Sequence, residues 1–137
     1  MANMLYDSAR QDFLEGRINW IADDVRCMLI AGSQYTPNFS AHRTLVDIPV
    51  PARVTNGVPL TNKSSTGGVA AAAPVTFSAV PAGSYPVTGL ILYIHDAAEN
   101  LSRLLVWIDT GIGFPVQPNG GDIIVVWDTG PNKIFKL

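Results

Sequence analysis

The sequence carries little charge. Asp, Glu, Lys and Arg make up 15% of its 137 residues, against roughly a quarter in ordinary soluble domains. Hydrophobic residues make up 47%, more than a chain of this length can easily hide in one core. We therefore expect part of the surface to be buried against other protein subunits. The alternative is a monomer whose surface simply carries few charges.

Basic runs are absent as well, and the formal net charge is −2. This argues against nucleic-acid binding as the main task, because affinity for the phosphate backbone depends on clustered Lys and Arg. A single cysteine, Cys27, excludes an internal disulfide framework and a Cys-based zinc site. The stretch 64–94 has no charged residue, but repeated glycines and prolines would interrupt a spanning helix, so we expect no membrane segment.

Residues for catalysis are equally scarce. Only His42 and His95 could serve as a histidine base, and the nucleophile motif Gly-x-Ser-x-Gly does not occur. On a strand, His95 and Asp96 would point to opposite faces. We therefore predict that the protein is not an enzyme and has no catalytic residues.

Cofactor and metal sites find no support either. The acidic residues Asp23, Asp24, Asp109, Asp122 and Asp128 lie beside expected turns, where Asp usually accepts backbone hydrogen bonds, and they match no EF-hand spacing. The glycine pairs 67–68 and 120–121 lack the lysine of a phosphate loop and indicate tight turns instead. We expect no cofactor and no metal ion.

Several β-branched or aromatic runs are separated by Gly, Pro and Asn, which is typical of short strands. They are Val25–Ala31, Val75–Val80, Val87–His95, Leu104–Asp109, Ile123–Trp127 and Ile134–Leu137. The pattern predicts a mainly β protein, with residues 1–137 forming a single-domain antiparallel β-sandwich, jelly-roll-like, with one or two short helices.

The helices and turns can also be placed. Asp7 or Ser8 could cap a helix that ends near Glu15, with Gly16 as its left-handed stop, so residues 1–16 form an N-terminal arm or helix. A second helix is expected over Ser40–Val46, capped by Ser40. Asn56–Gly57 predicts a hairpin between residues 52–54 and 58–60. The alanine run 70–73 predicts a loop or an edge strand.

Two of the strand runs, Leu90–Ile94 and Ile123–Trp127, are apolar on both faces. A sandwich strand normally alternates because one face meets water. Both faces of these strands must therefore be covered, by an arm, a helix or a neighbouring subunit. Trp107 and Trp127 lie inside apolar runs, which favours packing over a carbohydrate-binding platform that would also include Trp20.

Two stretches resemble a known family. The first is YDSARQDFLEGRINW at 6–20, leading into the strand at 25–30, and the second comprises DTGIGFPV at 109–116, PNGGDI at 118–123 and NKIFKL at 132–137. They resemble small structural proteins of tailed bacteriophages, over most of the chain and least over residues 60–90. The resemblance implies a capsid decoration (cement) protein. Such a protein is a homo-trimer or other symmetric homo-oligomer on the outside of the phage head, assembled in the host cytoplasm and bound to the major capsid protein.

The candidate contacts with the capsid are residues of the N-terminal segment and of the uncharged loops: Met4, Leu5, Tyr6, Phe13, Ala72, Pro74, Tyr85 and Pro86. Two alternatives remain open. One is a tail, baseplate or connector component, and the other is a carbohydrate-binding module that uses Trp and Tyr side chains.

Overall fold

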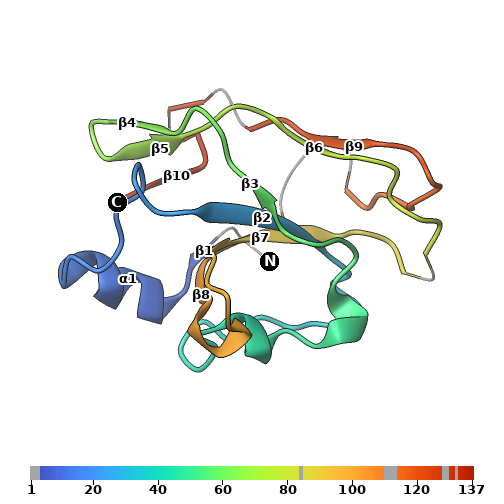
Figure 1. Cartoon of the computed structure of the whole chain (residues 1–137), viewed down its shortest axis with the longest axis horizontal. Helices are drawn as coiled ribbons and strands as arrows, with labels where there is room; N and C mark the ends of the chain where they lie inside the picture. The colour runs from blue at the N-terminus through green and yellow to red at the C-terminus, as the bar shows by residue number, and fades with distance from the viewer. Residues whose placement is uncertain (1–3, 84, 110–113, 128–129, 132) are drawn as a thin grey trace.

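The computed structural model describes residues 4–83, 85–109, 114–127, 130–131 and 133–137. The fold is mainly β with antiparallel sheets, as predicted (Figure 1). The largest sheet has five strands in the order β1-β8-β7-β2-β3. Their bounds are β1 Met4–Leu5, β8 Arg103–Ile108, β7 Gly89–Ile94, β2 Val25–Ile30 and β3 Val58–Pro59.

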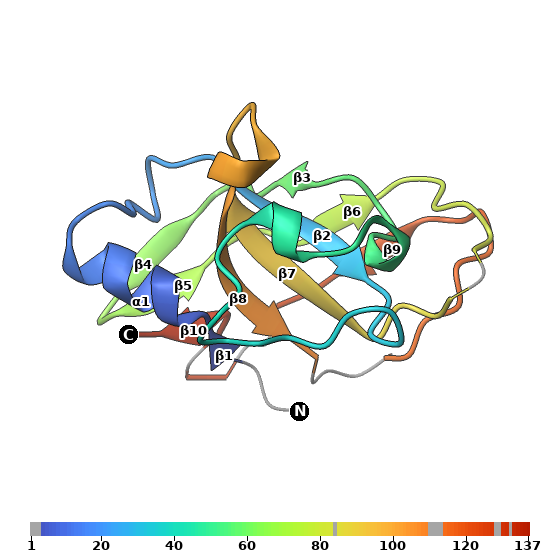
Figure 2. The ribbon, with the colours of Figure 1, turned by 90° about the horizontal axis from the view of Figure 1, so that it is seen from below.

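The centre of this sheet is buried on both faces. All six residues of β7 are buried, and β2 and β8 each have only one residue that is not fully buried. The smaller sheets lie on one side of the central sheet, and the loop segment after β2 lies on the other (Figures 1 and 2). The outer face of Leu90–Ile94 is therefore covered by this chain itself.

The second layer is divided between two smaller sheets. One contains β10 (Phe135–Lys136), β5 (Val69–Ala71) and β4 (Ser64–Thr66) in that order, and the other pairs β6 (Val75–Phe77) with β9 (Ile123–Val125). Gly67 and Gly68 have φ of 58° and 79° and form the tight turn between β4 and β5, as predicted. The start of the alanine run belongs to β5, which is the central strand of its sheet and not an edge.

Helix α1 (Asp7–Leu14) ends as the sequence predicts. Gly16 has φ of 70°, its N–H donates to the Phe13 carbonyl, and the Arg17 N–H donates to the Asp12 carbonyl. This is the Schellman arrangement, in which a left-handed glycine satisfies the last carbonyls. The predicted cap was wrong: Tyr6 occupies the N-cap position, and no side chain caps the helix.

Residues 4–16 pack as part of the fold and do not project from it as an arm. Met4 and Leu5 pair with Trp107 and Val106 of β8. The Tyr6 N–H donates to the Leu105 carbonyl at 3.1 Å, and the Tyr6 side chain is fully buried. The start of α1 is thereby fixed to the edge of the central sheet, and the first N–H of the helix, that of Asp7, donates to the Phe39 carbonyl at 2.9 Å.

The predicted helix at Ser40–Val46 is also wrong. The segment contains a turn followed by a 3-10 helix over Leu45–Asp47, and further 3-10 helices lie at Val50–Ala52 and Glu99–Leu101. The side chain of Asp47 accepts the N–H groups of Arg43 and Thr44 at 2.7 and 3.1 Å. Asp47 and Thr44 thereby form a capping box, which starts a 3-10 helix at Leu45 in place of the helix expected from Ser40.

The hairpin predicted at Asn56–Gly57 does not form. Val58 pairs with Cys27, and Arg53 forms a bridge with Ile30. Both flanks of the turn therefore pair with β2 and not with each other.

Candidate docking surface

The described residues contain no group of three His, Cys, Asp or Glu side chains able to hold a metal ion. The thiol of Cys27 is buried, and burial raises its pKa far above the ordinary value, which makes it a poor nucleophile. Asp23 and Asp122 accept backbone N–H groups, the turn role expected for them, while Asp24 pairs with Arg26. Asp128 lies outside the described residues.

None of the helices in the described part of the chain is long and apolar enough to span a membrane.

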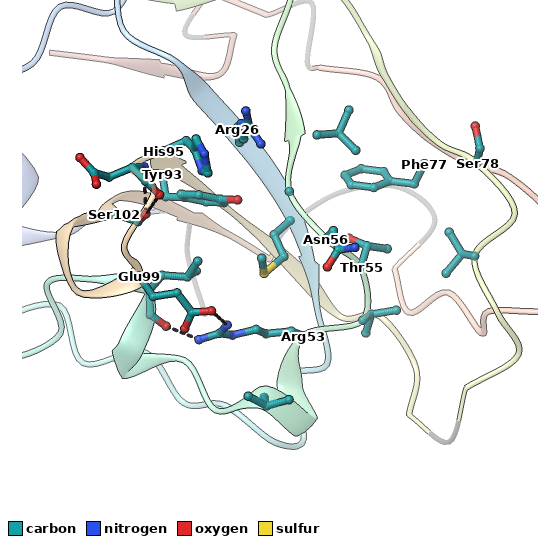
Figure 3. A pocket seen from close by; sticks show the side chains of 18 of the residues that line it. Arg26, Arg53, Thr55, Asn56, Phe77, Ser78, Tyr93, His95, Glu99 and Ser102 are labelled. Atoms are coloured by element: carbon teal, nitrogen blue, oxygen red, sulfur yellow. Dashed lines mark hydrogen bonds and ion pairs between the residues drawn. The ribbon is translucent and has the colours of Figure 1, made fainter.

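An open groove of about 870 Å³ runs past the edge strand β3 (Figure 3). Its two arginines are already engaged. Arg26 pairs with Asp24 at 2.9 Å. Arg53 pairs with Glu99 at 2.9 Å and also donates to the carbonyls of Leu45 and Ile48.

Arg53 therefore joins the 3-10 segments that form one side of the groove. The Arg53 guanidinium lowers the pKa of the exposed Glu99 carboxyl. The two internal ion pairs occupy the groove's arginines, which makes it a weak candidate for binding a charged ligand.

The three tryptophans do not form an exposed platform for a carbohydrate. Trp20 and Trp107 are buried, and the Trp20 indole N–H donates to the Ser64 carbonyl at 2.9 Å. Trp127 is half-buried, and its N–H donates to the Ala73 carbonyl at 3.0 Å. The tryptophans serve packing, as the apolar runs around Trp107 and Trp127 indicate.

The predicted contact residues fall into separate places. Leu5 and Tyr6 are buried in the core, so the expectation that they are exposed was wrong, whereas Met4 is 40% exposed. The reason is the pairing of β1 with β8, which draws this segment into the sheet. Contact between these residues and a capsid remains a prediction only for the exposed Met4.

Phe13 lies in an aromatic cluster. Its ring centroid is 6.1 Å from that of Phe135, and Trp20 meets Phe135 edge-on at 5.4 Å. These rings line a small surface hollow of about 260 Å³ beside the β4–β5 turn. Phe13 is half-buried, so most of its contribution is to the packing of α1 against β10.

The remaining candidates lie on loops. Tyr85 is 39% exposed and Pro86 is half-buried, in the segment that leads to β7. Ala72 is half-buried and Pro74 is exposed, between β5 and β6. The structure therefore brings Ala72 and Pro74 together, next to the ribbon of β6 and β9.

The outer face of this ribbon is an apolar surface, and Pro74 is its only member among the predicted contact residues. Ile124 is 61% exposed and Val126 is 70% exposed, whereas Val75 and Phe77 on the inner face of β6 are buried. Thr76 pairs with Ile124 and is also exposed. The ribbon thus presents Pro74, Thr76, Ile124 and Val126 to solvent, with Asp122 at one end.

The signal for this surface was present in the sequence. The run Ile123–Trp127 is apolar on both faces, but none of its residues is among the predicted contacts. In the described structure, Ile123, Val125 and Trp127 pack against the core while Ile124 and Val126 do not. This run is therefore where an apolar outer face stays uncovered.

The comparisons give no family: no protein-family model matches the chain, and no curated protein matches it.

Proposed function

We propose that this chain is a structural subunit of a tailed-phage virion, a decoration protein that binds the outside of the head and stabilises contacts between major capsid proteins. The observation that carries the proposal is the outer face of the β6–β9 ribbon. Ile124 and Val126 are exposed there, in a chain with only 15% charged residues. Such a face favours burial against another protein.

The mechanism is the addition of interface free energy across boundaries between shell subunits. Complete burial of an Ile or Val side chain contributes about 1.5–3 kcal/mol. An interface of ordinary size buries on the order of 1,600 Å² in total, with most of its energy in a few anchors. Separation of two shell subunits under the pressure of packaged DNA would then also require breaking these contacts, and repetition over the shell multiplies a modest local term.

In this proposal the decorating unit is a trimer or another symmetric homo-oligomer, and its partner is the major capsid protein. Met4, Tyr85 and Pro74 are the exposed residues of the predicted contact set and remain candidates for that interface. They lie on different segments of the chain, which suits a subunit that meets more than one neighbour.

The test is the amount of this polypeptide in purified virions, measured by quantitative mass spectrometry against the major capsid protein, with and without tails. A decoration protein is expected at a copy number comparable to that of the capsid protein, and it stays with tail-less heads. A few copies that leave with the tails would instead identify a tail, baseplate or connector component. Absence from virions would reject both.

A further inference from the structure

The open sheet edges of this protein are not equally protected. The Leu60 N–H donates to the Val25 carbonyl at 2.8 Å, so its neighbour Pro59 faces the open edge of β3, opposite Arg26. Proline has no N–H to offer an incoming strand, which blocks strand addition there. The exposed edge strand β4 is Ser64–Thr66, polar and preceded by Lys63, which also discourages pairing.

Strand β9 has neither form of protection. It hydrogen-bonds to β6 alone among the strands of the described structure, and residues 120–127 contain neither proline nor lysine. The sequence from Ile123 to Trp127 consists of β-branched and aromatic residues, which have high strand propensity. An apolar edge of this kind is a template for pairing with another strand.

The scarcity of charge permits a second copy as the partner, because no like charges need lie opposite each other in the pair. Asp122 is the one charged residue in 120–127. When two β9 strands pair antiparallel about Ile124, residue 122 of one lies opposite residue 126 of the other. The two Asp122 side chains therefore do not face each other, and each Oδ1 already accepts its own Ala79 N–H at 2.8 Å.

We propose that β9 pairs with β9 of a second copy of this chain, antiparallel and centred on Ile124. The two ribbons then form one four-stranded sheet, β6-β9-β9-β6, whose outer face carries Ile124 and Val126 from both copies. This pairing would make the symmetric oligomer of the proposed function a two-fold dimer. Its location on the phage head rests on the proposed function.

The pairing is weak for an isolated pair. Each β9 has three residues, so few main-chain hydrogen bonds are formed, and each contributes only about 0.5–1.5 kcal/mol net. When two copies are docked side by side on the shell, pairing of their β9 strands becomes effectively intramolecular. The high local concentration then favours the pairing. Self-association of the free chain is therefore expected only at high protein concentration.

The test uses the full chain and charge substitutions at the centre of the pair. Sedimentation velocity over a wide concentration range measures self-association of the wild type, Ile124→Lys, Ile124→Glu and an equimolar mixture of the two variants. Because the two residues 124 lie opposite each other, each variant alone places like charges together, and the mixture places opposite charges together. We expect each variant to weaken the dimer by about tenfold or more and the mixture to restore it.

Val46→Lys is the matched control, since Val46 is 57% exposed and lies on a 3-10 helix far from β9 in sequence. It is expected to associate as the wild type does. A second measurement is oxidative cross-linking of Ile124→Cys, with Val46→Cys as its control. The native Cys27 is buried and does not interfere, so a cross-linked dimer at residue 124 reports the register directly.

Three results would overturn the inference. The wild type could stay monomeric at the highest concentration, the wild type could form a trimer, or the mixture of the two variants could associate no more tightly than either variant alone. These outcomes concern the isolated chain and leave its presence on phage heads untouched. Conversely, a chain that dimerises through Ile124 but is absent from virions refutes the proposed function and leaves the pairing standing.

Discussion

Gly89 of β7 lies directly against the indole ring of Trp107 on the neighbouring strand β8. A Cβ at Gly89 would come within 2.6 Å of the Trp107 ring and 3.0 Å of the Ile108 carbonyl oxygen. The indole has little freedom to move, because Trp107 is buried and its ring packs edge-on against Tyr35 at 5.7 Å. The packing of Trp107 against the start of β7 therefore requires a residue without a side chain at position 89.

Gly89→Ala is accordingly expected to lower the free energy of unfolding by about 1–3 kcal/mol, the usual effect of overpacking a core. Urea unfolding followed by tryptophan fluorescence measures it. Gly83→Ala is the matched control, since its new Cβ would have no neighbour closer than 3.8 Å and should change stability by less than about 0.5 kcal/mol. Equal stability of the two variants would show that Trp107 can shift.

Tyr6 holds the N-terminal segment in the core. It is fully buried, and its hydroxyl is 2.7 Å from that of Tyr35. Tyr6→Ala should cost about 3–5 kcal/mol of stability, as for other large aromatic truncations. Met4→Ala, at a residue that is 40% exposed, should cost far less. Similar thermal unfolding midpoints for the two variants would mean that the segment is an independent arm.

The same two tyrosines make stability depend on alkaline pH. Burial raises the pKa of Tyr35 to about 12 and raises that of Tyr6 still further, while tyrosine in an unfolded chain titrates near pH 10. The folded state therefore keeps protons that the unfolded state loses. The contribution of Tyr35 is complete below about pH 10 and is lost as the pH rises towards 12.

We expect the urea concentration at the unfolding midpoint to decrease as the pH rises from about 10 to about 12. The decrease should be less steep in Tyr35→Phe, because phenylalanine has no hydroxyl to ionise. An identical pH profile for the wild type and Tyr35→Phe would contradict this assignment.

The sequence predicted the features that depend on local chemistry. The stop at Gly16 and the turn at Gly67–Gly68 follow from left-handed glycines. The strand β7 follows from the aliphatic and aromatic run Leu90–Ile94, which lies within the predicted strand Val87–His95. The predictions failed where distant partners decided the outcome. Residues on both sides of Asn56–Gly57 pair with β2 and not with each other. Asp47 forms a capping box with Thr44, which starts a 3-10 helix at Leu45 in place of the helix expected over Ser40–Val46.

The proposed docking surface likewise depends on tertiary structure as well as on the local sequence. Leu90–Ile94 and Ile123–Trp127 have the same doubly apolar pattern in sequence. One is buried on both faces by the chain itself, and the other leaves Ile124 and Val126 exposed. Which run is covered depends on how many elements stack on each sheet, and no residue within either run encodes that.

The exposed face of the β6–β9 ribbon is the docking surface that we propose for this chain. The most direct measurement is the occupancy of phage heads that lack the chain, titrated with wild type, Ile124→Lys and Val46→Lys. We expect wild type and Val46→Lys to saturate the heads alike. Ile124→Lys should need about a tenfold or higher concentration, because the proposed interface would then bury a charge in place of the exposed Ile124 side chain. If Ile124→Lys occupied the heads as tightly as the wild type, the ribbon would not be the docking surface.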